Sequence, residues 1–363
     1  MDVESKIDVM KSFAQEIVTE EDLRRVFEST EHPIAYDGFE PSGVAPIHFG
    51  LLRARNLKKM LSIGVKFKLY LADYFAFINN KLGGDLDHIR TAGEYFVEVW
   101  KACGIDVGKV EIIWAKDLMD GIGYWDRCLH VGKATSLERI RRAITIMGRT
   151  EGEKLSTAQL FYPAMQVTDI FQLDIDICQL GIDQRRANIL AREVADKYKW
   201  KKPAAVHHPI MLGLKGAPAG TKERIKENPD LMMEFKMSKS DPTSAIYMHD
   251  SYDAIKEKVN KAYCPERVTE GNPLFNFLEL ALLDDLNDPI KIERPKKFGG
   301  DLEVDNFWQL VKAYEEGKLH PVDLKGFVTE LLEKQIKPAR EHFEKDKRAK
   351  QLYETVAQYK ITR

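Results

Sequence analysis

Very little in the sequence points to a membrane, a metal centre or a disulfide framework. Only four cysteines occur in 363 residues, and no two of them form a C-x-x-C pair. Cysteines this far apart favour reduced thiols over a zinc site or disulfides. No apolar run reaches the roughly 20 residues that a membrane-spanning helix needs. We therefore expect a soluble, cytoplasmic protein that does not contact a membrane.

The sequence also has no large excess of positive or of negative residues. Lysine and arginine number 55, aspartate and glutamate number 57, and the formal net charge is −2. This balance argues against a protein that coats DNA or RNA by bulk charge, although it allows local basic patches. Aromatic residues make up 10% of the chain and apolar residues 44%. That composition excludes wholesale disorder, and the length allows two or three domains.

Alternating strand and helix patterns indicate an α/β fold. Three segments with apolar alternation or a short apolar run are predicted as strands, at 34–36, 65–71 and 110–114. Apolar residues at helical spacing form one stripe from Ile47 to Leu61 and another from Leu137 to Met147. Strands that alternate with helices favour a mostly parallel sheet. Beyond about Ser251 the strand pattern fades, which predicts a helical C-terminal part.

A polar stretch separates these two parts. The segment 213–230 contains three glycines and two prolines, a composition typical of a loop. A second break, at 291–301, is predicted as a turn within the helical part. We expect an α/β domain over 1–235, a lysine-rich loop and linker over 236–250, and a helical domain over 251–363.

A strand-to-helix junction at 36–50 carries the first phosphate-binding signal. It reads YDGFEPSGVAPIHFG, so a strand ends in a glycine-bearing turn and a helix is expected to open at Pro46. The start of a helix presents free N–H groups and partial positive charge, which suit a phosphate. His48 would add a hydrogen bond. Taken alone, the pattern also fits a histidine that is simply solvated at a helix start.

Two further segments combine polar groups at suggestive spacings. Residues 236–240, KMSKS, place two ammonium groups and two hydroxyls where they can surround one polyanion, although such a run is often a solvated loop. Tyr162, Gln166 and Asp169 lie at i, i+4 and i+7, so on a helix they share one face. A strip of this kind is a poor choice for an apolar core. The alternative is a solvent-exposed polar face.

Together these segments resemble the tyrosyl-tRNA synthetases of the archaeal and eukaryotic branch, which are class I aminoacyl-tRNA synthetases. In that class the two ATP-binding motifs read HIGH and KMSKS. Here KMSKS is complete, and Leu51 stands where the final histidine of HIGH is common. The resemblance covers nearly the whole chain and includes AYDGFEPSG, YPAMQVTDI, GIDQRRANILARE, KAYCPERVTEGNP, RPKKFGGDL and LHPVDLK.

The resemblance implies an α/β, Rossmann-like doubly wound domain that binds tyrosine, followed by a helical anticodon-binding domain. Tyr36 and Asp169 would bind the phenol oxygen of L-tyrosine, while Tyr162, Gln166 and Gln184 would hold its α-ammonium group. Phenylalanine would leave the two buried polar groups at the phenol end unpaired. Tyrosyl-tRNA synthetases as a family are known to discriminate against phenylalanine by about 10⁵ without editing.

The resemblance also implies ATP as a substrate, with Mg²⁺ carried by the nucleotide. The expected ATP-binding residues are Gly38, His48, Gly50, Lys236, Met237, Ser238, Lys239 and Ser240. Of these, His48, Lys236 and Lys239 would be catalytic, because they would stabilise charge on the phosphates as pyrophosphate leaves. We expect no protein-held metal, since neighbouring side chains such as His207 and His208 point in opposite directions on an extended segment.

The remaining implied partner is tRNA(Tyr). Arg185 is a candidate for contact with the first base pair of the acceptor stem, the alternative being an exposed arginine in an ion pair. Phe298 and His320 would stack on anticodon bases, and Asp323 would accept hydrogen bonds from a guanine edge. Relatives are homodimers joined through the catalytic domain. We expect the same here, with residues 120–150 as the candidate interface, and no DNA partner.

Two other functions remain open at this point. A tryptophanyl-tRNA synthetase would share the architecture, but Asp169 with Tyr36 favours a phenol over an indole. An RNA-binding protein could keep the fold without the activity, but the complete KMSKS loop and polar pocket argue against it.

Overall fold

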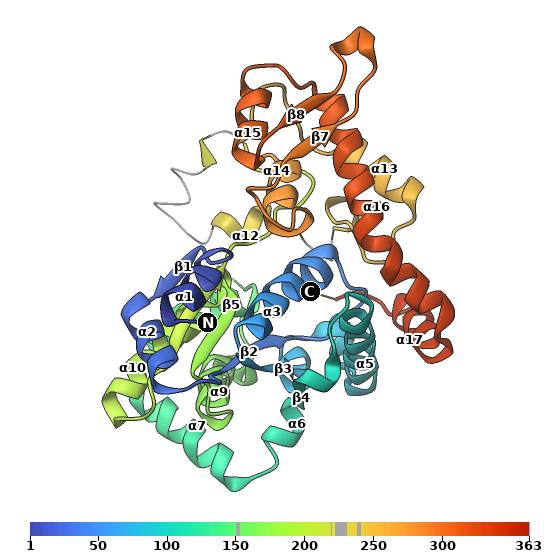
Figure 1. Cartoon of the computed structure of the whole chain (residues 1–363). Coiled ribbons are helices and arrows are strands. Elements are labelled where there is room, and N and C mark those ends of the chain that lie inside the picture. The colour runs from blue at the N-terminus through green and yellow to red at the C-terminus, as the bar shows by residue number, and fades with distance from the viewer. Residues whose placement is uncertain (150–152, 219, 222–230, 238–240, 363) are drawn as a thin grey trace. The chain divides into compact units, whose positions relative to one another are not determined.

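The computed structural model describes residues 1–149, 153–218, 220–221, 231–237 and 241–362 (Figure 1). The chain divides into two compact units. The first unit comprises Met1–Gly43, Asn56–Ile210 and Leu352–Arg363, and the second comprises Val44–Arg55 and Met211–Gln351. Among the described residues, no helix is both long and apolar enough to cross a membrane.

A six-stranded sheet forms the centre of the first unit. In spatial order its strands are β1 (Glu16–Val18), β6 (Ala204–His208), β5 (Ile177–Gly181), β2 (Ile34–Phe39), β3 (Lys66–Leu71) and β4 (Val110–Trp114). All neighbours pair in parallel except β1, which is antiparallel to β6 at the edge. The prediction of a mostly parallel α/β sheet is thereby confirmed.

The strand order reverses between β2 and β5. The chain runs outward from β2 through β3 to β4, and then returns to the other side of β2 with β5 and β6. Doubly wound folds bind ligands at such a switch point, outside the carboxyl ends of the strands. The three predicted strands correspond to β2, β3 and β4. The sequence analysis missed β5 and β6, whose five residues each are all buried and therefore show no alternation.

Helices cover this sheet, and one of them is almost entirely buried. The helices of the first unit are α1 (Val3–Lys11), α2 (Glu20–Ser29), α4 (Asp73–Ile78), α5 (Leu86–Ala102), α6 (Ala115–Leu118), α7 (Ile122–Ala134), α8 (Leu137–Ala143), α9 (Thr157–Gln172) and α10 (Arg185–Tyr198). Helix α3 (Arg53–Ser62) begins in the second unit and continues into the first. Helix α9 packs against α4, α7, α8 and α10. A capping box of Ser156 and Gln159 fixes its start.

The second predicted stripe of apolar residues, from Leu137 to Met147, is only partly buried. Ile140, Ile144 and Met147 are buried as expected, whereas Leu137 is 56% exposed. Leu137 occupies the first position of α8, where the chain has only just entered the helix. A periodic pattern identifies the buried face of a helix but does not show how far the covering elements extend along it.

The second unit is mainly helical, with one small sheet. Its helices are α12 (Met232–Phe235), α13 (Tyr252–Lys261), α14 (Pro273–Phe277), α15 (Phe307–Glu315) and α16 (Pro321–Lys345), and α17 (Lys347–Ala357) begins there. Strands β7 (Ile290–Ile292) and β8 (Leu302–Val304) pair antiparallel. The predicted helical character of this part is confirmed, and the two three-residue strands within it are too short for a period to be recognised in the sequence.

The two compact units do not coincide with the domains predicted from the sequence, of which the first ends at 235 and the last begins at 251. Residues 44–55 group with 211–351, although they follow directly after β2 in sequence. The physical reason is backbone pairing: Ile47 N–H donates to the Ile246 carbonyl, and Met248 N–H donates to the Ala45 carbonyl, both at 2.9 Å. The assignment of a catalytic and an anticodon-binding domain stays a prediction.

Candidate functional site

Four of the five residues expected to bind tyrosine lie on β2 and α9 in the first unit. Tyr36 is on β2, and Tyr162, Gln166 and Asp169 are on α9, with at most 8% of each residue exposed. The strip is therefore buried, which rules out the interpretation of a solvated polar face. Gln184 follows β5 directly and accepts a hydrogen bond at 3.1 Å from the Gln166 amide. The set therefore draws on both sides of the switch point between β2 and β5.

A carboxyl group with tyrosine hydroxyls around it occupies one end of this site. Tyr124 on α7 donates a hydrogen bond of 2.8 Å to Asp169 Oδ1. Burial raises the pKa of Asp169 well above its usual range, and the hydroxyls of Tyr124 and Tyr70 act against that rise. The sequence analysis missed Tyr70 and Tyr124. Tyr70 lies on β3 and Tyr124 on α7, so no spacing in the sequence links either of them to Asp169.

Two buried hydroxyls at this end lack a hydrogen bond of good geometry to any described residue. They belong to Tyr36 and Tyr70, which are 1% and 2% exposed. Burial raises the pKa of both phenols well above their usual value, so both stay protonated at neutral pH. A buried polar group without a partner is costly, typically about 1–3 kcal/mol. A ligand with a hydroxyl group would supply the missing partner.

A second carboxyl group lies at the other end, where the sequence analysis assigned no role. Glu40 follows β2 directly, and its Oε1 accepts a hydrogen bond of 2.6 Å from the Tyr162 hydroxyl. The Asn79 amide donates to both carboxylate oxygens at 3.1 and 3.2 Å, and Lys81 Nζ lies 3.7 Å away. A carboxylate four residues after the strand predicted at 34–36 was the available signal, since the carboxyl ends of such strands form the ligand-binding edge of a sheet.

Among the residues expected to bind ATP, His48 and Gly50 lie in the second unit. The helix begins with a wide turn, His48–Leu52, which continues into α3. It does not open at Pro46 as predicted, because Pro46 pairs with Tyr247 in an antiparallel bridge. The Pro46 carbonyl instead accepts the first amides of the helix, from Phe49 and Gly50 at 3.0 and 3.2 Å.

Gly50 is required by close packing. A Cβ atom built at this position would overlap the Sδ of Met248, which is fully buried. The same Met248 belongs to the segment that pairs with Ala45–Ile47. Gly38 lies on β2 in the first unit, where an added Cβ would be 3.5 Å from the Tyr70 ring.

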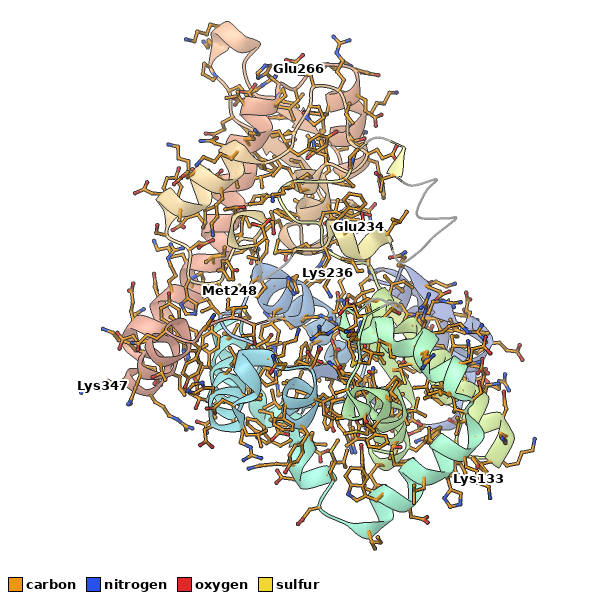
Figure 2. All side chains as sticks on the ribbon, turned by 180° about the vertical axis from the view of Figure 1, so that it is seen from behind. Lys133, Glu234, Lys236, Met248, Glu266 and Lys347 are labelled. Carbon is orange, nitrogen blue, oxygen red and sulfur yellow. The ribbon has the colours of Figure 1, made fainter. Side chains whose placement is uncertain are left out.

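The start of the KMSKS segment is held by backbone contacts in the second unit. Lys236 follows α12, two residues after Glu234 (Figure 2). It pairs with Leu212, and the buried Met237 donates its N–H to the Met211 carbonyl at 3.1 Å. Ser238, Lys239 and Ser240 lie outside the described residues. The HIGH-like segment and the described start of KMSKS, Lys236 and Met237, are almost two hundred residues apart in sequence and belong to one compact unit.

Arg185 starts α10 and forms an ion pair with Glu16 at 2.8 Å, as the alternative interpretation of this residue expected. It also lines a hollow of about 250 Å³ together with Arg139, Arg142 and Arg186. Three of these four arginines are ion-paired, Arg185 with Glu16, Arg139 with Glu193 and Arg142 with Glu138. The hollow therefore gathers four guanidinium groups, which are suited to phosphate, but their charge is partly offset.

The expected anticodon residues lie in the second unit. The His320 side chain caps α16, where its Nδ1 accepts the Val322 amide at 3.2 Å, and its Nε2 lies 3.4 Å from Glu266. Asp323, in the first turn of the same helix, is 4.0 Å from Arg294. Arg294 and Phe298 belong to the segment between β7 and β8, so the three expected residues come from neighbouring segments.

The contact between Gly50 and Met248 gives a first prediction. Gly50→Ala should lower the free energy of unfolding by about 1–3 kcal/mol, because the new methyl group overlaps a buried side chain. Combining it with Met248→Ala, which removes the overlapping atoms, should cost less than the sum of the two single changes. Urea denaturation of the four proteins measures this. Additive effects would show that the two side chains do not compete for the same space.

The buried carboxyl of Asp169 gives a prediction about pH. As pH rises above the usual aspartate range, the unfolded chain loses this proton first, so the free energy of unfolding falls. The variant Asp169→Asn has no ionisable group at this position, so its free energy of unfolding does not fall for this reason. Without ligands, the stability of the variant relative to the parent should rise by about 1 kcal/mol or more between about pH 5 and about pH 8.

Urea denaturation at both pH values measures the Asp169 effect. The exposed Asp117→Asn on α6 is the control and should shift stability equally at the two values. A constant difference for Asp169→Asn would contradict the raised pKa.

Comparison with known proteins shows the family of this chain. The family model described as tRNA synthetases class I (W and Y) matches residues 28–221 and 229–337. The cytoplasmic tyrosine–tRNA ligase 1 of Arabidopsis thaliana is 41% identical, over 100% of this chain and 90% of that protein. The tyrosine–tRNA ligase of Sulfurisphaera tokodaii is 42% identical, over 95% and 94%.

Solved structures give the same result. Tyrosyl-tRNA synthetase from Pyrococcus horikoshii, complexed with L-tyrosine, superposes with a TM-score of 0.90 at 37% identity, over 98% of this chain and 100% of that one. Tryptophanyl-tRNA synthetase from Aeropyrum pernix superposes with a TM-score of 0.66 at 17% identity, over 94% and 85%, a likeness of fold alone. This chain therefore belongs to the class I tRNA synthetase family of the tryptophan and tyrosine enzymes.

Proposed function

We propose that this chain activates L-tyrosine with ATP, forming tyrosyl-adenylate and pyrophosphate, and then transfers the tyrosine to the terminal ribose of tRNA(Tyr). The observation that carries the proposal is the pair of buried hydroxyls, of Tyr36 and Tyr70, beside the Asp169 carboxyl. The relatives named tyrosine–tRNA ligase, at about 41–42% identity over nearly the whole chain, support it.

The polar end of the pocket suits a phenol better than an indole. A phenol hydroxyl both donates and accepts, so it can donate to Asp169 and accept from the Tyr36 hydroxyl. An indole N–H only donates, and would leave the Tyr36 hydroxyl without an acceptor. Phenylalanine would satisfy neither group, which is why a synthetase of this kind needs no editing step.

The opposite end suits an ammonium group. Tyr162, Gln166 and Gln184 present hydroxyl and amide oxygens there, and Glu40 adds a negative charge next to the Tyr162 hydroxyl. A carboxylate that accepts a charge-assisted hydrogen bond from an ammonium group forms a stronger contact than neutral acceptors do. Together the two ends fix both the side chain and the amino group of tyrosine.

Adenylate formation would use positioning and charge stabilisation. The tyrosine carboxylate is already an anion at neutral pH, so it attacks the α-phosphorus without a general base, and the bond to pyrophosphate breaks. His48, Lys236 and Lys239 are the proposed catalytic groups, since each offers a positive or donating group to the phosphates. Gly38, Gly50, Met237, Ser238 and Ser240 complete the proposed ATP-binding set.

Mg²⁺ would come with the nucleotide. It prefers phosphate oxygens and water and needs few protein ligands in sites of this kind. Among the residues that the structure describes, no group of three or more histidine, cysteine, aspartate or glutamate side chains is placed to hold a metal.

The proposed tRNA contacts divide between the two units. Arg185 and the other arginines of its hollow would meet acceptor-stem phosphates and the first base pair. In the second unit, Phe298 and His320 would stack on anticodon bases while Asp323 accepts from a guanine edge. On this basis we assign the catalytic role to residues 1–235 and the anticodon-binding role to 251–363, with the KMSKS loop and linker between them.

We also propose a homodimer, formed through α7 and its neighbours. Large apolar side chains on this face are unusually exposed: Ile122 by 86%, Trp125 by 43%, Leu129 by 74%, Leu137 by 56% and Phe161 by 55%. Several large apolar side chains exposed on neighbouring helices are typical of a protein–protein interface. The first four lie within the predicted interface of residues 120–150.

The function is tested by amino-acid-dependent ATP–pyrophosphate exchange with tyrosine, phenylalanine and tryptophan in parallel. We expect exchange with tyrosine and at least about 10³-fold less with the other two, because only a phenol satisfies Asp169 and Tyr36. Exchange with tryptophan would overturn the pocket assignment. No exchange from the folded protein would favour an RNA-binding protein on an inactive synthetase fold.

The dimer is tested by placing charge on its proposed interface. Ile122→Asp with Leu129→Asp should turn a dimer into a monomer in sedimentation equilibrium, because two carboxylates would be buried without partners. Val322→Asp is a matched control, since Val322 is also apolar and 67% exposed but lies on α16. A monomeric parent protein, or a double variant that stays dimeric, would contradict the assignment.

A further inference from the structure

The loop between α4 and α5 has an unfavourable backbone conformation. Asn80 and Leu82 have φ values of 57° and 50°, and Gly83 and Gly84 follow at 74° and 73°. The left-handed region is disfavoured for residues other than glycine, and leucine rarely adopts it. Asn80 and Leu82 are the two such residues here, and Leu82 in particular keeps this conformation only where surrounding contacts hold it.

This loop positions the carboxylate proposed to bind the ammonium group. Asn79, at its start, is 1% exposed and donates to both oxygens of Glu40 and to the Met147 carbonyl. Lys81, within the loop, approaches Glu40 to 3.7 Å. Glu40 in turn accepts from Tyr162. The direction of the Glu40 carboxylate therefore depends on the conformation of the loop.

A distant segment of the same unit, Tyr359–Thr362, holds this loop in place. The Thr362 hydroxyl accepts the Gly83 N–H at 2.8 Å and donates to the Asn80 carbonyl, so it connects two of the left-handed residues. The Ile361 side chain lies against Gly43 and faces Leu82 across it. Gly43 has a φ of 106° and comes three residues after Glu40. The segment thus contacts both the 79–84 loop and the chain three residues after Glu40.

A third contact anchors the segment. The Tyr359 ring stacks on His88 of α5, with ring centroids 4.0 Å apart and an angle of 22° between the planes. Thr362 and Ile361 are both half-buried. The loop has other contacts as well, since Leu82 is 4% exposed and Arg149 donates to the side-chain and backbone oxygens of Asn79, whereas a Cβ built at Gly83 would meet no atom within 4 Å.

We propose that Tyr359–Thr362 is a positioning segment for the amino-acid site, in which Thr362 fixes the 79–84 loop so that Asn79 and Lys81 orient Glu40 toward the substrate ammonium group. This inference rests on the proposed function, because it takes L-tyrosine as the substrate. Thr362 touches neither substrate nor reacting atoms. Its effect is transmitted through two hydrogen bonds, the loop backbone and the Asn79 side chain.

Two substitutions of Thr362 separate the hydroxyl from the bulk of the side chain. Thr362→Val keeps the shape and removes both hydrogen bonds, whereas Thr362→Ser keeps the hydroxyl. The probes are L-tyrosine and 3-(4-hydroxyphenyl)propionate, which carries the phenol and the carboxylate but no amino group. Binding of each to the full chain is measured at equilibrium, and the KM for tyrosine and for ATP is measured by pyrophosphate exchange.

We expect Thr362→Val to weaken L-tyrosine binding about three- to tenfold and to raise its KM in parallel. Binding of the amino-free analogue, the KM for ATP and kcat should stay close to those of the parent, and Thr362→Ser should behave as the parent does. Equal weakening of both ligands would mean a purely structural role and would overturn the proposal. So would an unchanged affinity for L-tyrosine.

Hydrogen exchange tests the loop itself without any ligand. In Thr362→Val the amides of residues 80–84 should exchange faster, while peptides of the central sheet keep their protection. Unchanged exchange in the loop would overturn the positioning role even if tyrosine binding were weaker. A parent protein that binds neither tyrosine nor its analogue would instead overturn the proposed function, and the inference about the ammonium group with it.

Discussion

The proposed pocket depends on one ionisable group buried in the core of the first unit. The Asp169 carboxyl is 1% exposed, and such a group is tolerated there only with hydrogen-bond donors around it. The Tyr124 hydroxyl on α7 donates to it directly, while the Tyr70 hydroxyl on β3 lies near the carboxyl without a hydrogen bond of good geometry. In the proposed site a ligand hydroxyl would complete this set, and the proposed selectivity rests on that.

The position of this carboxyl follows from the topology of the sheet. Helix α9 carries Asp169 and leads into β5, and β5 pairs with β2 at the point where strand order reverses. Tyr36 and Glu40 come from the β2 side, and Gln184 comes from the β5 side. In the proposed site the two ends of the amino acid would therefore be bound by segments on both sides of one switch point, which is where doubly wound folds usually bind ligands.

In the second unit, backbone pairing positions the HIGH-like segment. The segment Ala45–Ile47 pairs with Ile246–Met248, and Met248 fills the space that Gly50 leaves open. This pairing brings the HIGH-like segment into the same compact unit as Lys236, the first residue of KMSKS. The glycine of the first motif is thus explained by packing as well as by its proposed closeness to ATP.

The sequence by itself determined the class of sheet, the family resemblance and the residues of α9, because these depend on local periodicity and on motifs that are contiguous in the chain. It could not show that Tyr70 and Tyr124 lie near Asp169, since the three residues come from different elements and no spacing connects them. It also could not show the short strands β7 and β8, or that Thr362 meets Gly83. Those features were decided by tertiary structure, in which desolvation and hydrogen bonding act between residues that are distant in sequence.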